Sequence, residues 1–367
     1  MRNMIESFRW AWRRRHAARR VALQQRILQQ QSMIGLDVGA AEGLQPHWWA
    51  YEGAVQMYCF EPHPQSADRL RRLYDRSPFR RMFHVLPVAL AGQTGERTLY
   101  MLNAPTGSSL YPLDPKSEFV GERNAYVYPI RELPVAVRKL SEVLDEQRIQ
   151  RADIAKLDVQ GAELEILRGL DPQRAANLTL VEVEVNIVGG INRSLSPYIG
   201  APSWSELDQF LTAHGLRLLD VSVARSHRGR SGDSDWYQRE VFRVYDNSPG
   251  VSAAAWEVDA VYVRDYRALI AAADQAALRR LIVALGGYRF FSEAYFIVEE
   301  SAAAGVFTAA AASELQRDIL SWHRLVARRA WHGRSRVWGL WRNLLTRLGV
   351  SQLRRWKQYM WFQYPNG

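Results

Sequence analysis

The stretch Met33-Ile34-Gly35-Leu36-Asp37-Val38-Gly39-Ala40-Ala41-Glu42-Gly43 decides the fold that the sequence predicts. Its first six residues form a short apolar run, typical of a strand buried in a parallel sheet. The small residues that follow let a backbone pass close to a ligand. A second apolar run, Val55 to Phe60, ends on Glu61. A strand, a glycine turn, a helix, a second strand and an acid about 20 residues on predict a nucleoside site, with the acid on the ribose hydroxyls.

Two details of the turn favour S-adenosylmethionine over NAD. Only Gly39 and Gly43 are present, so the full G-x-G-x-x-G spacing is missing. Asp37 sits at the end of the strand, where a pyrophosphate would meet a like charge. A ligand without phosphate, carrying a cationic amine and a sulfonium, would instead be attracted. These residues alone also fit an ordinary buried strand followed by a tight turn.

Composition sets the outer limits. The chain has 367 residues, enough to bury a large core in one or two domains. Its single cysteine, Cys59, excludes a disulfide framework and indicates a reducing compartment. No apolar run approaches the ~18 residues that span a bilayer, and no signal peptide is visible. We therefore expect a cytoplasmic protein.

The net charge of +10 is concentrated at the two ends. Residues 1–31 contain eight Arg and one Glu, and residues 317–367 contain ten Arg, one Lys and one Asp. The two ends thus carry +7 and +10, which leaves −7 for the residues between them. We predict a mildly acidic globular domain at 32–300, a helical basic arm at 1–31 and a helical basic tail at 301–367.

Tryptophan is enriched in the same two ends, which hold eight of the 13 Trp residues, several at helical spacing among arginines. An anionic membrane interface selects this pattern. We expect residues 1–31 and 313–367 to bind the inner face of the cytoplasmic membrane. Helices packed on their own domain are the alternative. Nucleic acid is a less suitable partner, because the middle of the chain offers no basic cleft and no RNA-binding signature.

Charged residues also interrupt two later apolar runs. In the strand expected at 153–159, Lys156 and Asp158 share one face, and Asp158 lies at the carboxyl end. The strand expected at 178–185 alternates valines with two carboxylates, Glu182 and Glu184. Together they indicate a polar pocket, although a salt-bridged strand end or a solvated sheet edge would give the same pattern.

Seven segments then occur in a characteristic order: Ile34–Gly43, Phe60–Pro62, Val88–Leu90, Ser108–Leu110, Val137–Leu140, Lys156–Glu163 and Leu180–Glu184. Together they resemble the FkbM family of S-adenosylmethionine-dependent O-methyltransferases, from residue 33 to about residue 265. The block at 156–163 is the most specific. Many family members have Glu where this chain has Gln160, so the resemblance implies no charged role at that position.

The resemblance implies an α/β fold, the Rossmann-like class I methyltransferase sheet of seven mostly parallel strands with helices on both faces. Its third strand is expected at Phe83–Leu90, its sixth at Leu216–Val223 and its antiparallel seventh at Glu257–Arg264. Two arginines in the intervening basic segment, Arg225 and Arg228, are expected to hold a phosphate of a linked sugar. A mobile basic loop is the alternative.

The resemblance also implies roles at the site. Glu61 is expected on the cofactor ribose, with the rest of the cofactor site at Asp37, Gly39, Ala40, Glu42, Gly43 and Ala89. Asp158 is the leading general base or acceptor-orienting residue, with Lys156 setting its charge state, Glu182 in reserve and Gln160 near the acceptor. No metal is expected, since no Cys/His cluster has ligand spacing. The predicted reaction is methyl transfer to a hydroxyl of a sugar or lipid-linked saccharide in surface glycan biosynthesis. An RNA methyltransferase and a non-catalytic membrane scaffold are the alternatives.

Overall fold

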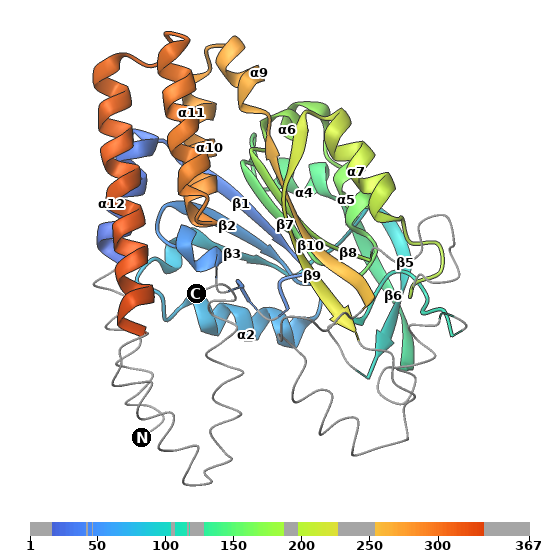
Figure 1. The fold of residues 1–367 in the computed structure, drawn as a ribbon. Coiled ribbons are helices and arrows are strands. Elements are labelled where there is room, and N and C mark those ends of the chain that lie inside the picture. The colour runs from blue at the N-terminus through green and yellow to red at the C-terminus, as the bar shows by residue number, and fades with distance from the viewer. Residues whose placement is uncertain are drawn as a thin grey trace, which may run out of the picture.

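A seven-stranded sheet forms the centre of the protein (Figure 1). The computed structural model describes residues 17–41, 43–45, 47–103, 107–115, 117, 128–186, 197–226 and 254–333. The strand order is β3-β2-β1-β7-β8-β10-β9. The strands are β1 (Met33–Val38), β2 (Val55–Phe60), β3 (Phe83–Leu86), β7 (Ile154–Leu157), β8 (Leu180–Asn186), β9 (Leu216–Ser226) and β10 (Ala254–Arg264). Strand β10 pairs antiparallel with both neighbours, whereas the other pairs are parallel, as predicted.

Helices cover both faces of this sheet, because side chains alternate between two apolar faces. One face packs against α4 (Leu140–Glu146), α5 (Glu163–Arg168), α6 (Pro172–Asn177) and α7 (Trp204–Ala213). The other face packs against residues 17–28, η1 (Trp48–Tyr51), α2 (Pro64–Tyr74), α10 (Gln275–Gly287), α11 (Phe291–Ala303) and α12 (Ala309–Gly333). Two short helices lie in connections: η2 (Arg80–Met82) and α9 (Tyr266–Ala271). The result is a three-layered α/β domain.

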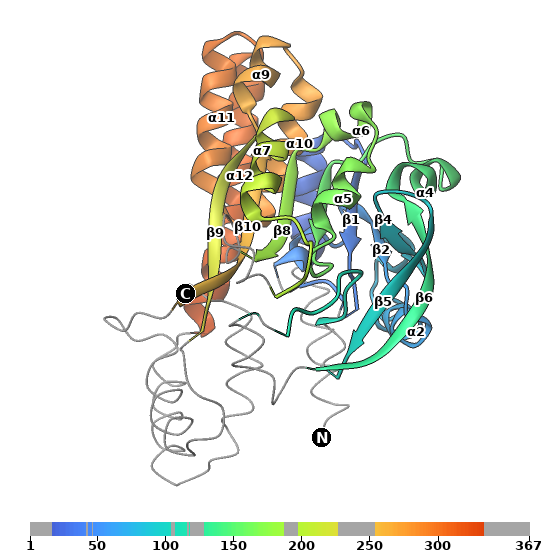
Figure 2. The same ribbon diagram turned by 90° about the vertical axis from the view of Figure 1, so that its right-hand side faces the viewer.

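A second, three-stranded sheet stands beside the first (Figure 2). It has the order β4-β6-β5, with β4 (Ala89–Ala91), β5 (Gly95–Leu102) and β6 (Pro129–Lys139). The single strand expected at Phe83–Leu90 is therefore wrong. Pro87 interrupts it, since proline has no N–H for a ladder, and the chain crosses from β3 in the large sheet to β4 in the small one.

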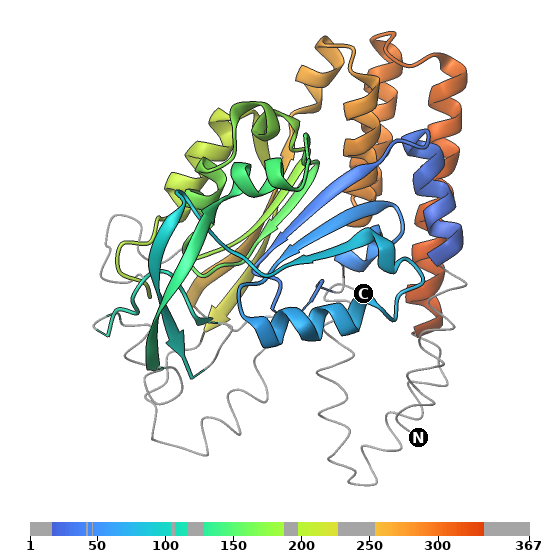
Figure 3. The same cartoon turned by 180° about the vertical axis from the view of Figure 1, so that it is seen from behind.

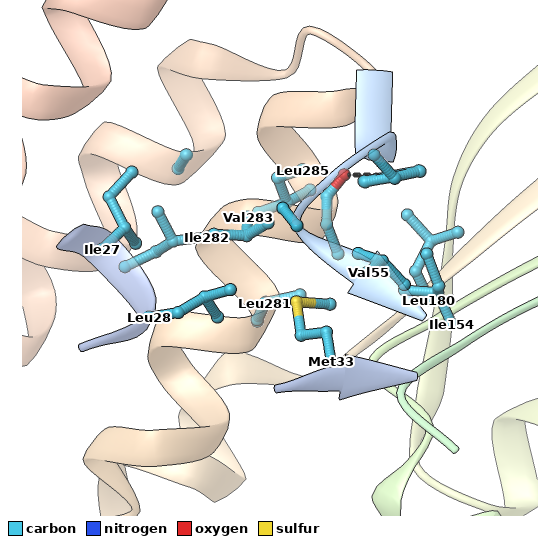
Figure 4. Close-up of a cluster of buried hydrophobic side chains, with 14 of the residues drawn as sticks. Ile27, Leu28, Met33, Val55, Ile154, Leu180, Leu281, Ile282, Val283 and Leu285 are labelled. Atoms are coloured by element: carbon cyan, nitrogen blue, oxygen red, sulfur yellow. Dashed lines mark hydrogen bonds between the residues drawn. The ribbon is translucent and has the colours of Figure 1, made fainter. Parts of the chain in front are cut away.

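Both ends of the described chain belong to the core. Figure 4 shows Ile27 and Leu28 packed with the α10 residues Leu281 and Ile282 over Met33 of β1. Residues 17–28 also lie beside α12 (Figure 3), where the Arg26 guanidinium pairs with Asp318 at 2.6 Å. The boundaries expected at 31/32 and 300/301 thus do not separate structural units: the described parts of arm and tail complete the domain.

Two consecutive glycines in α10 allow this close packing. A Cβ on Gly286 would lie 2.4 Å from the Trp322 ring, and one on Gly287 would lie 2.2 Å from the Tyr51 ring. Trp322 and Tyr51 are both fully buried. Trp322, expected at a membrane interface, is therefore a core residue. None of the helices in the described ranges has both the length and the hydropathy that a bilayer span requires.

Candidate active site

A cleft of about 1170 Å³ lies at the carboxyl ends of the parallel strands. Its walls include residues that follow or end β1, β2, β7 and β8: Gly39, Glu61, Asp158 and Glu184. The small sheet and the segment between its strands β5 and β6 add an apolar wall, formed by Leu99, Met101, Leu102, Leu110, Leu113 and Val135. Open α/β sheets bind ligands at this edge.

The turn after β1 requires glycine at its first position. Gly39 has φ +85°, and a Cβ there would lie 1.9 Å from the backbone oxygen of Asp158. The N–H groups of Gly39 and Ala40 both donate to the Phe60 carbonyl, at 3.2 and 3.1 Å. Gly43, with φ +83°, closes the turn by donating to the Ala40 carbonyl. The turn is thereby held between the ends of β2 and β7.

Glu61 lines the cleft where β2 ends, as predicted from the sequence. Its Oε1 accepts a hydrogen bond from the N–H of His63 at 2.8 Å, which fixes the carboxylate at the start of α2. The side chain is buried, and burial raises the pKa of Glu61 above its ordinary value. Ala89, the first residue of β4, lies in the same wall.

Asp37 is buried beneath the turn, at 1% exposure. Its Oδ2 has no hydrogen-bond partner within the described residues. Burial raises the pKa of Asp37 to about 6, although the neighbouring charge of Lys156 opposes that shift. A buried carboxylate with an unpartnered oxygen is the group that a bound cation would stabilise.

Lys156 sits between the strands that carry the carboxylates. Its Cα pairs with that of Asp37 on one side and that of Glu182 on the other, so the three side chains share a face. Its Nζ donates to Asp158 Oδ2 at 3.0 Å. Burial would lower the pKa of Lys156, but the charges of Asp158, Asp37 and Glu182 raise it above its usual value. Lys156 is therefore a fixed positive charge and not a base.

Gln160 joins two carboxylates in the cleft. Its Nε2 donates to Asp158 Oδ1 at 3.1 Å and to Glu184 Oε1 at 2.6 Å. Its Oε1 lies 2.9 Å from the Tyr198 hydroxyl, and its backbone oxygen accepts from the Ser109 hydroxyl at 2.6 Å. Both amide hydrogens are thus used, and φ of +58° holds the residue in the left-handed region. Gln160 fixes the acidic groups that it contacts.

Glu182 is buried at 2% exposure and tied to three donors. His47 lies 3.0 Å away through its Nε2, and the Trp48 indole and the Tyr288 hydroxyl donate to the same oxygen. Burial would raise the pKa of Glu182, but the hydrogen bond from His47 and the charge of Lys156 lower it below its usual range. A carboxylate held ionised in this way is a poor base, so the structure favours an orienting role for it.

Three groups near Lys156 and the carboxylates around it were not among the residues predicted from sequence. His47 and Tyr288 contact Glu182, and Asp259 of β10 pairs in register with Glu184. Burial, with the charges of Glu182 and Asp158, raises the pKa of Asp259 to about 6. The alternation of polar and apolar residues in β10 could have revealed Asp259, whereas His47 and Tyr288 lie in segments without such an alternation.

The structure does not place every predicted residue. Glu42 and Arg228 lie outside the described residues. The backbone of Arg225 lies in β9, where it pairs with Ala255 of β10, and its side chain is outside the described part. The remaining predicted site residues lie around or directly beneath the cleft.

The strand order, the antiparallel β10 and the glycine turn beside an acid at the end of β2 define a class I methyltransferase fold. Residues 37–218 match the family described as the methyltransferase FkbM domain. The chain thus belongs to the FkbM methyltransferases, as its motifs predicted.

Two curated relatives each match part of the chain. Methyltransferase sdnD of Sordaria araneosa is 30% identical over 154 residues, and the match covers 37% of this chain and 60% of that protein. The 2-O-methyltransferase NoeI of Sinorhizobium fredii (strain NBRC 101917 / NGR234) is 27% identical over 152 residues, 39% of this chain and 59% of that protein. The chain thus spans about three fifths of the length of each relative.

Among solved structures, the methyltransferase FkbM from Methylobacillus flagellatus KT is similar, with 14% identity and a TM-score of 0.33. The likeness covers 63% of this chain and 43% of that one.

The cofactor of this family is S-adenosylmethionine, and the residues present fit it. Asp37, with its unpartnered oxygen, suits the cationic amine and sulfonium end, and Gly39 leaves room for a ligand against the backbone. Glu61 would hold the ribose hydroxyls. When bound, this cofactor supplies an electrophilic methyl group on a positively charged sulfur.

Proposed function

We propose that the protein is an O-methyltransferase whose acceptor is a hydroxyl of a sugar or of a lipid-linked saccharide. The observation that carries this proposal is the polar group beside the glycine turn, in which Gln160 holds Asp158 and Glu184 in the cleft. Carboxylates and amides in fixed positions are suited to orienting several hydroxyl groups at once. The relative NoeI is named a 2-O-methyltransferase, which supports oxygen as the acceptor atom.

In this proposal Asp158 orients the acceptor. Each of its oxygens already accepts one hydrogen bond, from Lys156 and from Gln160, and keeps a lone pair for an acceptor hydroxyl. Lys156 keeps the carboxylate in place through its hydrogen bond. The apolar wall that includes Leu99 and Met101 would exclude water from one side of the cleft. Alignment of the hydroxyl is thus the main contribution of these residues.

Calorimetry with S-adenosylmethionine tests the cofactor site. Loss of the Glu61 carboxylate in Glu61→Ala should weaken binding by about 2–4 kcal/mol, because charge-assisted hydrogen bonds to the ribose are lost. Glu96→Ala, at an exposed glutamate of β5, is the matched control and should bind as the wild type does. Unchanged affinity in Glu61→Ala would remove the ribose assignment.

The acceptor class is tested by labelling. Extracts of saccharides, lipid-linked saccharides and RNA are incubated with the protein and methyl-labelled S-adenosylmethionine, and the labelled fraction is identified by mass spectrometry. Label in the saccharide fractions is expected. Label confined to RNA would establish the rival acceptor, and a protein that binds no cofactor would point to a scaffold.

We also propose that the protein binds the inner face of an anionic membrane. The support is the charge that lies outside the described helices: five Arg and one Glu in residues 1–16, and six Arg and one Lys without an acid in residues 334–367. Near an anionic bilayer each such charge contributes about 1 kcal/mol. Binding of the full chain to anionic but not neutral liposomes, weakened by salt, is expected. Replacement of Arg13, Arg14 and Arg15 by Gln should reduce it, and equal binding to both liposomes would refute the proposal.

A further inference from the structure

The charged residues on one sheet face form a row that runs from the cofactor side to the far edge. Glu61 directly follows β2, Asp37 lies on β1, Lys156 on β7, Glu182 on β8 and Asp259 on β10. If Glu61 holds the ribose and the glycine turn follows β1, the reactive end of the cofactor lies toward β7. The acceptor hydroxyl must then approach from the side of β8 and β10, since transfer is in line. A proton acceptor should be sought there.

One side chain on that side has the character of a general base. His47 reaches Glu182 of β8 with its Nε2 at 3.0 Å, and its side chain keeps 31% exposure although Glu182 has only 3%. Gln45, two residues earlier in the sequence, lines the cleft, and His47 lies next to that wall without being part of the lining. The His47 ring rests edge-on against Tyr288, with the centroids 4.9 Å apart. The imidazole is thus held from one side and open on another.

The contacts of Glu182 determine which ring nitrogen is available. Glu182 is ionised and can only accept, so Nε2 of His47 must carry a hydrogen. In the neutral ring Nδ1 then has the lone pair. Within the described part of the chain, Nδ1 has no hydrogen-bond partner, and the atom is not buried. The Trp48 and Tyr288 donors hold the same carboxylate oxygen, which prevents it from turning away.

We propose that His47 is the catalytic base of the methyl transfer and that Glu182 is its positioning residue, held in place by Trp48 and Tyr288. The inference rests on the proposed O-methyltransferase function. The acceptor oxygen bonds to the methyl carbon and passes its proton to Nδ1 of His47. The pair of electrons of the broken carbon–sulfur bond stays on sulfur, whose positive charge is thereby neutralised. The imidazolium, stabilised by Glu182, later releases its proton to solvent.

The test combines turnover, cofactor binding and nuclear magnetic resonance on the full chain. His47→Gln should lower kcat by about 10²–10⁴ with an acceptor identified by labelling, because a positioned base contributes that factor. Its affinity for S-adenosylmethionine, measured by calorimetry, should stay within about threefold of the wild type. Added imidazole should restore part of the turnover of His47→Gly. His214→Gln, at an exposed histidine whose ring contacts Phe210 at the end of its own helix, is the matched control and should behave as the wild type does.

Long-range ¹⁵N spectra of histidine-labelled protein provide a readout that needs no acceptor. In spectra of the neutral form of the ring, we expect hydrogen on Nε2 and none on Nδ1 of His47 in the wild type, and a mixture of the two tautomers in Glu182→Gln. That second result separates orientation of His47 from a merely structural role for Glu182.

Each outcome decides the inference. Normal turnover in His47→Gln with normal cofactor binding would exclude His47 as the base, and hydrogen on Nδ1 in the wild type would exclude the proposed geometry. If no acceptor in the extracts is labelled although the cofactor binds, the His47 tautomer in the ¹⁵N spectra decides whether the proposed geometry holds. A wild type that binds no S-adenosylmethionine would refute the proposed function itself, together with this inference.

Discussion

The two halves of one sheet face differ in chemistry although they belong to the same strands. In one half Met33, Ile154 and Leu180 are fully buried beneath residues 17–28 and α10. In the other half, two to four residues further along those strands, Asp37 and Glu182 are buried just as deeply. The apolar half is stable through removal of its surface from water. The polar half is stable only as far as its members pair with one another.

The polar half is also unbalanced. Asp37, Asp158, Glu182, Glu184 and Asp259 gather around one lysine and one histidine in the part of the face that the structure describes. A site with excess buried negative charge is suited to a cationic ligand, which the sulfonium and amine of S-adenosylmethionine provide. The apolar half therefore maintains the fold, whereas the polar half keeps an excess of negative charge that a bound cation would neutralise.

The strongest test of this contrast is removal of the only lysine in the row. Lys156→Met should lower the free energy of unfolding by about 3–5 kcal/mol near neutral pH, because buried carboxylates lose their counter-charge. Urea denaturation measures it. Lys139→Met, in β6 outside the row, is the control and should change stability by less than about 0.5 kcal/mol. A loss below about 1 kcal/mol in Lys156→Met would show that the row does not depend on the lysine.

A matched change in the apolar half should lower the free energy of unfolding slightly less, and this loss should respond differently to pH. Leu281→Ala removes a buried side chain from α10 and should cost about 2–4 kcal/mol through the cavity it leaves. Its cost should be the same at about pH 5 and pH 8. The cost of Lys156→Met should be smaller at the lower pH, where the unpaired carboxylates take up protons. Equal pH responses in urea denaturation would contradict the distinction between the halves.

The affinity for S-adenosylmethionine should rise with pH. Because burial raises the pKa of Asp37 to about 6, the free protein is more stable with this group protonated, and that stability is lost as the pH rises through 6. A bound cation favours the ionised form. Calorimetry should therefore show about tenfold weaker binding near pH 5 than near pH 8. Asp37→Asn should bind weakly and without this dependence, and a wild-type affinity independent of pH would contradict the role of Asp37.

Much of the polar half was predictable, because strands repeat every two residues. Lys156, Asp158 and Glu182 interrupt apolar runs in the sequence, and the shared carboxyl edge of a parallel sheet brings them together. His47 and Tyr288 could not be predicted in the same way. His47 precedes the short helix η1, and Tyr288 follows α10. In the sequence, His47 is 135 residues and Tyr288 is 106 residues away from Glu182.

In the described parts of the chain ends, residues 17–28 and α12, the sequence pattern correctly predicted helices but not what those helices pack against. Apolar residues at helical spacing among arginines fit a membrane surface and a protein core equally well, since both bury one face of a helix. Ile27 and Trp322 lie in the same buried cluster, and Trp322 fits there because Gly286 leaves room on α10, a property of tertiary packing.

The smallest effect is expected where these ends meet. Arg26→Gln removes the ion pair with Asp318, which lies at the surface with Arg26 half exposed, and should lower the free energy of unfolding by at most about 1 kcal/mol. Thermal unfolding at low and high salt measures it, because screening should weaken the pair only in the wild type. A loss of several kcal/mol would mean that this pair, and not the apolar contacts around it, holds the two helices together.

The pairing of Arg26 with Asp318 also constrains how the protein is made. The two residues are 292 positions apart, and the helix at 17–28 packs in one cluster with Leu315, Ile319 and Trp322. At the ribosome, where chains grow by roughly 5–20 residues per second, that helix waits roughly 15 to 60 s for its partners. Its apolar face is exposed throughout, and Tyr288 reaches Glu182 late in the same interval. Nascent chains of this enzyme should thus depend on chaperone binding near their N-terminus until the last helices emerge.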